Sequence, residues 1–291
     1  MNRPSLSEAQ KLAHEGFKVI PVSCELYSDC ITPIETLKKL KYISQHCYML
    51  ESAEVDQKWG RYTFLGYDPR MEITCTDGNL SIKAGGCVNI KTIKTADAIR
   101  SIISENLSPR MSYLPPFTGG LVGYFSYDYI KYVEPTLALD AKDEEGFKDF
   151  DLMLFDKVIA FDNYRQKIIL IVNIRCDDVE SEYHKAEGEL ATMKALLKNG
   201  SGCTETGGRM TSPVKYLFDR DGFCEMVEKA KEYIRDGDIF QVVLSNRLEA
   251  DYEGSLLDAY RVLRTTNPSP YMFYFSSDDL EIAGASPETL V

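Results

Sequence analysis

The sequence predicts an α+β fold built on large antiparallel sheets with helices outside them. Most of its apolar segments are short, rich in β-branched and aromatic residues, and separated by turn residues, as expected of strands. Fewer segments repeat apolar residues at steps of three and four behind a capping residue, as expected of amphipathic helices. With 291 residues, of which 44% are hydrophobic, the chain is long enough to bury a large core.

The first part of the chain supplies most of the predicted strands. Ser5 and Glu8 have the spacing of a capping box, and Thr32 followed by Pro33 is a second helix start, because proline fits the first helical position. The elements predicted here are a helix ending near Gly16, a strand at 17–23, a helix ending near Ser44, strands at 46–53, 62–66, 70–76 and 80–84, and a helix at 95–107.

A hairpin and a long helix are predicted next. Asp162 and Asn163 form a turn-prone pair between β-branched runs at 158–161 and 167–174. The following segment carries one apolar stripe on an otherwise charged background, which predicts a helix packed on the core. The stripe consists of Val179, Tyr183, Ala186, Leu190, Met193 and Leu197.

A segment rich in Gly, Ser and Thr separates two predicted domains. Residues 198–213 lack apolar periodicity, which predicts a mobile linker. We therefore expect an amino-terminal domain at 1–197 and the beginning of a second, incomplete domain at 214–291. The second domain should start with a helix that ends at Gly237.

A strand at 239–250, a helix at 255–265 and a strand at 271–276 should follow that helix. The first of these strands places polar side chains on one face and apolar ones on the other. A polar face on a core strand suggests a lined cavity, and a solvent-exposed outer face is the alternative. The face in question carries Gln241, Val243, Ser245 and Arg247.

Composition argues against several classes of function. The 45 acidic and 33 basic side chains leave a net charge of -12, which disfavours a nucleic-acid or anionic-membrane partner. Charged residues interrupt the amino terminus, and no later stretch approaches about 18 apolar residues, so neither a signal peptide nor a membrane span is predicted. The eight cysteines form no C-x-x-C pair, which favours buried, reduced thiols over zinc or disulfides. These features predict a cytoplasmic protein.

Four stretches carry a resemblance to a known family. The first, 48–54, contains Leu-Glu-Ser, and the second, 119–128, has the pattern G-G-x-x-G-Y-x-x-Y-D. The second is not a dinucleotide fingerprint, because its glycine spacing is wrong, and its glycines predict close backbone approach within a sheet. The third stretch joins 237–245 with 267–273, and the fourth is a G-x-S-P-E turn at 284–288.

In this order the stretches resemble the large-subunit family of anthranilate and aminodeoxychorismate synthases. The resemblance runs from Tyr48 to the last residue, and implies an α/β/β/α sandwich of which this chain is a truncated, amino-terminal fragment. It also implies a chorismate-using subunit of anthranilate synthase, which converts chorismate and ammonia to anthranilate and pyruvate in tryptophan biosynthesis. Magnesium as the cofactor and a glutamine amidotransferase subunit as the source of ammonia follow from the same resemblance.

The family's feedback site for L-tryptophan joins the L-E-S segment to the N-P-x-P-Y-M segment. An indole would pack on the proline and methionine, while the serine and backbone groups hold the charged end. Carried over, the site consists of Leu50, Glu51 and Ser52 from one predicted domain and Pro270, Tyr271 and Met272 from the other.

Catalytic residues and magnesium ligands are expected beyond Val291, because the family's motifs for them have no match in this sequence. His14, His46 and His184 lie outside matching motifs and receive no catalytic role. Two alternatives stay open. One is aminodeoxychorismate synthase of the folate pathway, although the L-E-S segment favours anthranilate. The other, for this chain alone, is a non-catalytic tryptophan-binding module.

Overall fold

The chain forms two compact units. One contains Met1–Thr204 together with Tyr260–Val291, and the other contains Glu205–Ala259. This grouping differs from a division at the predicted 198–213 linker, because the last strands pair with strands near the amino terminus. The predicted domain boundaries stay a prediction. The computed structural model describes residues 2–54, 60–91, 95–134, 136–137, 143, 145–203 and 207–288.

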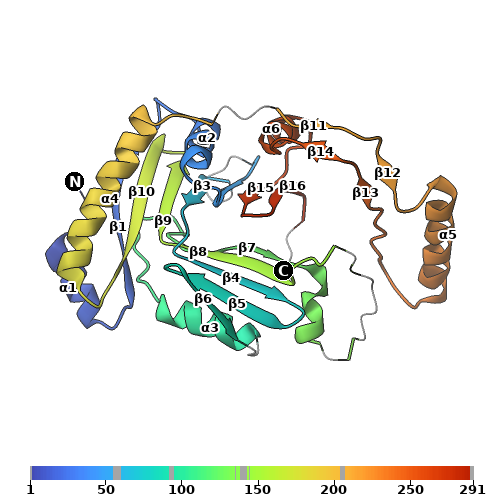
Figure 1. The fold of residues 1–291 in the computed structure, drawn as a ribbon, viewed down its shortest axis with the longest axis horizontal. Helices are drawn as coiled ribbons and strands as arrows, with labels where there is room; N and C mark the ends of the chain where they lie inside the picture. The colour runs from blue at the N-terminus through green and yellow to red at the C-terminus, as the bar shows by residue number, and fades with distance from the viewer. Residues whose placement is uncertain are drawn as a thin grey trace. The chain divides into compact units, whose positions relative to one another are not determined.

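The first unit is built on a seven-stranded sheet in which all neighbouring strands are antiparallel (Figure 1). The hairpin predicted around Asp162 is confirmed as β9–β10, with Asp162 paired to Lys167. The order along the sheet is β1 (Val19–Tyr27), β10 (Lys167–Arg175), β9 (Lys157–Asp162), β3 (Tyr62–Tyr67), β2 (Cys47–Glu51), β15 (Tyr271–Ser276) and β16 (Glu281–Ser286).

A second, five-stranded antiparallel sheet packs against the first. Its order is β6 (Cys87–Lys91), β5 (Asn79–Ala84), β4 (Met71–Thr76), β8 (Phe150–Phe155) and β7 (Gly120–Phe125). The chain crosses between the sheets at Asp156, the residue between β8 and β9. The core between the sheets contains Tyr48 and Phe275 from the first sheet and Val122, Met153 and Phe155 from the second.

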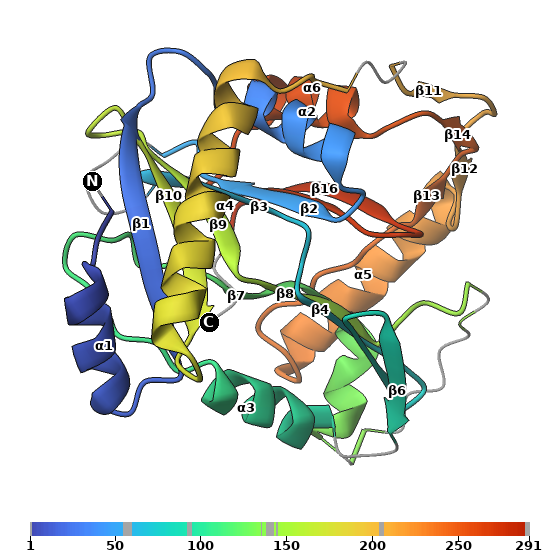
Figure 2. The same ribbon diagram turned by 60° about the vertical axis from the view of Figure 1, so that its left-hand side comes forward.

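Helices cover the outer faces of the two sheets, which confirms the predicted α+β fold with large antiparallel sheets. α4 (Val179–Asn199) lies along β10 and β1, and α2 (Pro33–Ile43) lies on β2 and β3 (Figure 2). α1 (Leu6–His14) packs beside α4, and α3 (Thr95–Glu105) covers the five-stranded sheet through Ile102. None of the helices in the described ranges is long and apolar enough to cross a membrane.

The helix-start signals act as the sequence predicts. The Ser5 hydroxyl accepts a hydrogen bond from the Glu8 N–H at 3.4 Å, and the Glu8 carboxylate accepts one from the Ser5 N–H at 2.8 Å, which completes the capping box. The Thr32 hydroxyl accepts from the Glu35 N–H at 3.2 Å and so caps α2. In α4 every stripe residue after Val179 is buried.

The second unit holds one long helix and two short strand pairs. α5 (Arg220–Asp236) is capped by Asp219, whose carboxylate accepts a hydrogen bond from the Gly222 N–H at 2.8 Å. It ends at Gly237, whose φ of +82° is in the left-handed region that glycine tolerates. The strand pairs are β11 (Arg209–Met210) with β14 (Tyr252–Glu253), and β12 (Lys215–Tyr216) with β13 (Leu248–Glu249).

The strand predicted at 239–250 is wrong over most of its length. Only Leu248–Glu249 is a strand, and Phe240 and Val243 are 101% and 80% exposed. A strand needs a neighbour for its backbone hydrogen bonds and a cover for its apolar face, and among the described residues no strand pairs with the part before Leu248. The polar face predicted to line a cavity therefore does not form at Gln241, Val243, Ser245 and Arg247.

Candidate functional site

The two segments predicted to form a tryptophan site, which include β2 and β15, are direct neighbours in the seven-stranded sheet. β2 and β15 run antiparallel, with Glu51 opposite Met272. The pairing extends past β2, because the Ala53 N–H donates to the Ser269 carbonyl at 2.9 Å. Both segments belong to one compact unit, so they do not meet across the boundary between the two units. Tryptophan binding there stays a prediction.

Strand alternation divides the predicted residues between the two sides of the sheet. Leu50 packs against the core between the sheets, and Ser52 directly follows the end of β2. Tyr271 precedes Met272 in β15 and so lies on the same side of the sheet as Leu50. Glu51 and Met272 lie on the other side, under the helices, where Met272 is 3% exposed. One ligand therefore cannot contact all of these side chains at once.

On the helix side, α6 (Leu257–Thr266) encloses the Glu51 carboxylate. Its Oε1 accepts hydrogen bonds from the Tyr260 hydroxyl at 2.6 Å and from Arg264 Nε at 2.5 Å, and its Oε2 accepts one from Arg264 Nη2 at 2.7 Å. The Glu51 side chain is 7% exposed. Burial and the neighbouring Glu51 charge raise the pKa of the Tyr260 hydroxyl, which therefore stays a donor at neutral pH. Glu51 is engaged with the helix on both oxygens.

On the side between the sheets, the candidate residues are partly accessible. The Ser52 hydroxyl accepts a hydrogen bond from the Glu54 N–H at 3.1 Å, and its own proton can point to a ligand. Pro270 is half-buried just before β15, and Tyr271 is 37% exposed. An amino acid with an indole ring would need both a hydrogen-bonding group and apolar surface from these residues.

The fourth motif belongs to the same sheet. Gly284 lies in β16 opposite Phe273, and a Cβ at Gly284 would be 2.3 Å from Phe273 Cζ. The Phe273 ring can lie across the sheet only because this position has no side chain. The turn predicted at 284–288 starts later than expected, since β16 continues to Ser286. The hydrogen bonds of the β15 ladder extend the strand through the first part of the motif.

The glycines of the 119–128 motif allow β7 to approach its neighbours closely. A Cβ at Gly123 would be 1.9 Å from the Asp151 carbonyl oxygen, and one at Gly119 would be 2.5 Å from Asn173 Nδ2. No side chain fits at either distance. The predicted structural role of this motif is therefore the one that the geometry supports.

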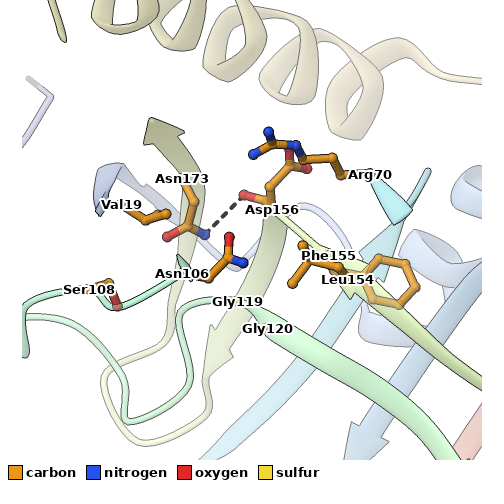
Figure 3. Close-up of a pocket in the computed structure, with 10 residues that line it drawn as sticks. All are labelled: Val19, Arg70, Asn106, Ser108, Gly119, Gly120, Leu154, Phe155, Asp156 and Asn173. Carbon is orange, nitrogen blue, oxygen red and sulfur yellow. Dashed lines mark hydrogen bonds between the residues drawn. The ribbon is translucent and has the colours of Figure 1, made fainter. Parts of the chain in front are cut away.

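Gly119 and Gly120 of this motif border a cavity of about 40 Å³ (Figure 3). The Asn173 amide donates to the backbone carbonyl of Asp156 at 3.0 Å and to that of Thr118 at 2.7 Å. Burial raises the pKa of the Asp156 carboxyl, and Lys157 and Arg70 oppose this effect. The cavity has room for roughly one to three water molecules and is far below the roughly 300 Å³ of a small-molecule site.

Two larger hollows open beside the amino-terminal residues, with volumes of about 640 and 330 Å³. They share Arg3 and Tyr113, whose ring lies 5.8 Å from the guanidinium carbon. Both linings mix acidic and basic side chains, and neither contains a residue from the four motifs. They carry no feature specific to chorismate or tryptophan.

One cluster of described residues has the donor types of a metal site. His46, Glu72 and Asp278 place their ligand atoms within 4.8 Å of one another, with His46 Nε2 at 3.0 Å from Asp278 Oδ1. Lys83 Nζ, however, binds Glu72 Oε2 at 3.1 Å and Asp278 Oδ2 at 3.2 Å, so its charge already compensates both carboxylates. Mg²⁺ prefers about six oxygen ligands. This set, with an imidazole and a lysine, does not fit it.

A second buried carboxylate, Asp149, anchors the 3-10 helix η1 (Tyr127–Tyr132) to the five-stranded sheet. It accepts hydrogen bonds from the Tyr132 hydroxyl at 2.8 Å and from Lys131 Nζ at 2.8 Å. Burial acts to raise the pKa of Asp149, but the bonds from Lys131 and Tyr132 outweigh it and hold this pKa below its usual value. This site is structural. Like Glu51, its buried carboxylate binds one tyrosine hydroxyl and one cationic side chain.

All eight cysteines carry free thiols. The prediction of buried thiols is confirmed for Cys24, Cys47 and Cys75, whereas several others are exposed. Burial raises the pKa of Cys47 to about 11, and burial together with the Asp149 charge raises that of Cys75 to about 11. Both thiols therefore stay protonated and unreactive near neutral pH.

The partners of Glu51 were not among the residues predicted from the sequence. Tyr260 and Arg264 lie four residues apart and so share one face of α6. A buried acid within the apolar run of β2 needs a cation, and a tyrosine-arginine pair at helical spacing is a candidate. That signal was present, but many other pairs in the chain fit it equally well.

A protein family described as chorismate binding enzyme matches residues 45–291. The anthranilate synthase component 1 of Acinetobacter calcoaceticus is 37% identical over 98% of this chain and 59% of its own length. That of Aquifex aeolicus is 37% identical over 99% of this chain and 59% of its own. The chain thus spans about three fifths of the length of these curated relatives.

Solved structures agree with these matches. The anthranilate synthase component I of Streptococcus pneumoniae TIGR4 superposes with a TM-score of 0.61 and 28% identity, over 91% of this chain and 57% of that one. The menaquinone-specific isochorismate synthase MenF of Escherichia coli has a TM-score of 0.52 at 14% identity, over 98% and 56%, which is a likeness of fold alone. The resemblance first seen in four short motifs extends over most of the chain.

Proposed function

Since the chain belongs to the family of chorismate binding enzymes, we propose that it is part of the large subunit of an anthranilate synthase. Relatives at 37% identity carry that name, and all four sequence motifs lie within the matched region. The reaction converts chorismate and ammonia to anthranilate, pyruvate and water. A bond forms between the nitrogen and the ring, the ring hydroxyl leaves, and pyruvate is eliminated. The proposed setting is the cytoplasm.

The proposed activity needs two components besides this chain. Ammonia would come from a glutamine amidotransferase subunit, and bound Mg²⁺ would act as a Lewis acid at the ring carboxylate. The cluster of His46, Glu72 and Asp278 does not fit Mg²⁺, so no catalytic step is assigned to it. We expect the 291-residue chain alone to form no anthranilate, because it matches none of the family's catalytic motifs.

We also propose that L-tryptophan regulates the enzyme by binding at the β2–β15 junction. The observation that carries this proposal is the direct pairing of the two strands, with Leu50 and Tyr271 on one side of the sheet and Ser52 directly after the end of β2. Glu51 and Met272 would support the site from the helix side, and Pro270 would border it. The resemblance indicates the same residues. We divide them into those that contact tryptophan and those that hold the contacting residues in place.

Energetics explain why a hydroxyl is needed at this site. Burying an indole removes roughly 150 to 250 Å² from water, which at about 25 cal/mol per Å² contributes roughly 4 to 6 kcal/mol before ordering costs. A micromolar site requires about 8 kcal/mol. Polar contacts must supply the difference, and we assign that role to the Ser52 hydroxyl.

The test has two parts. The complete gene product, incubated with chorismate, Mg²⁺ and ammonium, should form anthranilate, identified by fluorescence and chromatography, and L-tryptophan should inhibit it. The 291-residue chain should bind L-tryptophan in a calorimetric titration. Aminodeoxychorismate as the product would replace the proposal with the folate-pathway enzyme. Tryptophan binding without any turnover of chorismate would favour a binding module.

A further inference from the structure

The Glu51 network joins three elements of the first unit at the end of β2. Glu51 is the last residue of β2 and pairs with Met272 of β15. Its carboxylate takes three hydrogen bonds from Tyr260 and Arg264 of α6, at 2.5 to 2.7 Å. Tyr260 is fully buried, and its ring lies 5.9 Å from that of Tyr274 on β15. The helix therefore holds both strands of the junction from the same side.

The anchoring of Glu51 by α6 on one side of the sheet also fixes the orientation of the neighbouring side chains on the other side. Leu50 precedes Glu51 in β2, so alternation directs it away from α6, and Ser52 is the residue that directly follows Glu51. Beyond Glu51 the described backbone pairing is reduced to the bond between Ala53 and Ser269. Without Tyr260 and Arg264, the end of β2 would lose its side-chain anchor to α6, and the Glu51 charge would need water. A twist at Glu51 would turn both flanking side chains.

From this geometry we propose that Arg264 and Tyr260 are positioning residues for the tryptophan site. They hold Glu51, and through it the orientation of Leu50 and Ser52, without touching the ligand. This inference rests on the proposed tryptophan site. It also assigns Glu51 a role as a support, where sequence alone placed it among the ligand contacts.

The chain offers a matched control in the other sheet. Asp149 is a buried carboxylate that accepts a tyrosine hydroxyl, from Tyr132, and a cationic nitrogen, from Lys131, each at 2.8 Å. Arg264→Met and Tyr260→Phe remove a cation and a hydroxyl at Glu51. Lys131→Met and Tyr132→Phe, the matched changes at Asp149, remove the same groups away from the β2–β15 junction. Both pairs of changes should destabilise the fold, but only the changes at Glu51 should weaken tryptophan binding.

The experiment measures L-tryptophan affinity by calorimetry and amide hydrogen exchange by mass spectrometry on the 291-residue chain. Arg264→Met should weaken Kd at least tenfold, or about 1.4 kcal/mol, and Tyr260→Phe about threefold. Arg264→Lys keeps the positive charge but loses the two-pronged guanidinium geometry, so its affinity should lie between those of Arg264→Met and the unaltered chain. Both control variants should stay within twofold of the unaltered chain. In parallel, exchange at 47–54 should rise in Arg264→Met and remain unchanged in the controls.

The outcomes separate the two proposals. If the unaltered chain binds no tryptophan, the proposed feedback site fails, while exchange at 47–54 still decides whether α6 holds β2. If the unaltered chain binds and Arg264→Met binds equally well, the positioning role is overturned. An equal loss of affinity in Lys131→Met would also overturn it, because general destabilisation would then explain the effect. A selective loss, rescued in part by Arg264→Lys, supports it.

Discussion

Replacing Gly123 by alanine is the most direct test of how the glycine motif works. The new Cβ would sit 1.9 Å from the Asp151 carbonyl oxygen and 2.9 Å from Leu152 Cα, where real contacts essentially never fall below 3.0 Å. Both obstacles are backbone atoms, so no side chain can rotate away. β7 must therefore move away from β8 by about 1 Å or more, which breaks hydrogen bonds of ordinary length.

The cost follows from the ladder that this movement opens. Losing about two or three backbone hydrogen bonds at roughly 1 kcal/mol each, and loosening Val122 in the core between the sheets, gives about 3 to 5 kcal/mol. For a unit of this size that lowers Tm by about 10 °C. Thermal and urea unfolding followed by circular dichroism would measure it. The matched control is Gly188→Ala in α4, where nothing lies within 4 Å of the new Cβ and alanine should stabilise by up to about 1 kcal/mol.

A Gly123→Ala variant whose Tm stays within about 2 °C of the unaltered chain would refute this explanation. β7 would then tolerate a side chain, and the motif's glycines would need another role. Gly120→Ala gives a graded comparison, because the nearest atom to its Cβ is Phe117 Cε2 at 3.7 Å. Its φ of +140° adds only local backbone strain, roughly 1 to 3 kcal/mol. The expected order of stability is Gly188→Ala, then Gly120→Ala, then Gly123→Ala.

Three further predictions concern the candidate site and the buried ionisable groups. Ser52→Phe should weaken tryptophan inhibition of the complete enzyme at least about tenfold, because it fills the site and removes the hydroxyl. Met272→Thr should weaken inhibition less, since Met272 lies on the helix side of the sheet. Inhibition curves would measure both effects, and an unchanged response in Ser52→Phe would rule out the proposed site. The lowered pKa of Asp149 means that its stabilisation is complete above about pH 4, the unfolded value, and is lost as the pH falls through the folded value. Asp149→Asn should therefore lose less stability than the unaltered chain between pH 5 and pH 3 in acid-unfolding curves, and parallel curves would contradict this. With pKa values near 11, Cys47 and Cys75 should react with a thiol reagent at pH 8 only after denaturant is added, while the exposed cysteines react at once. Labelling followed by peptide mass spectrometry would measure this, and modification of Cys47 or Cys75 before denaturant is added would contradict the prediction.

Local signals in the sequence were enough to predict most helices and strands of the first unit. The capping box at Ser5, the Thr32 cap and the stripe of α4 act within a few residues, so they need no knowledge of distant parts. The strand β6 was missed although its signal is local as well. Gly85 and Gly86, both with positive φ, form the two-residue turn between β5 and β6, a pattern typical of hairpins.

Alternation at 239–250 was misleading for a different reason. It correctly states which side chains would share a face in a strand, but a strand also needs a neighbour and a cover. Those come from elsewhere, and the described residues supply them only at Leu248–Glu249. The same limit applies to the 284–288 motif, where pairing with β15 extends β16 through positions that the sequence suggests are a turn.

The sequence by itself determined the family, the fold class and the two segments of the candidate site. Each depends on residue order and on short-range chemistry, which the sequence states directly. Only the tertiary structure decided which side of the sheet each residue serves. β2 and β15 come from opposite ends of the chain, and a helix packs on one side of their junction and a second sheet on the other. Glu51 therefore binds Tyr260 and Arg264, while Leu50 faces the core between the sheets, because the partners of a side chain depend on the packing of distant elements.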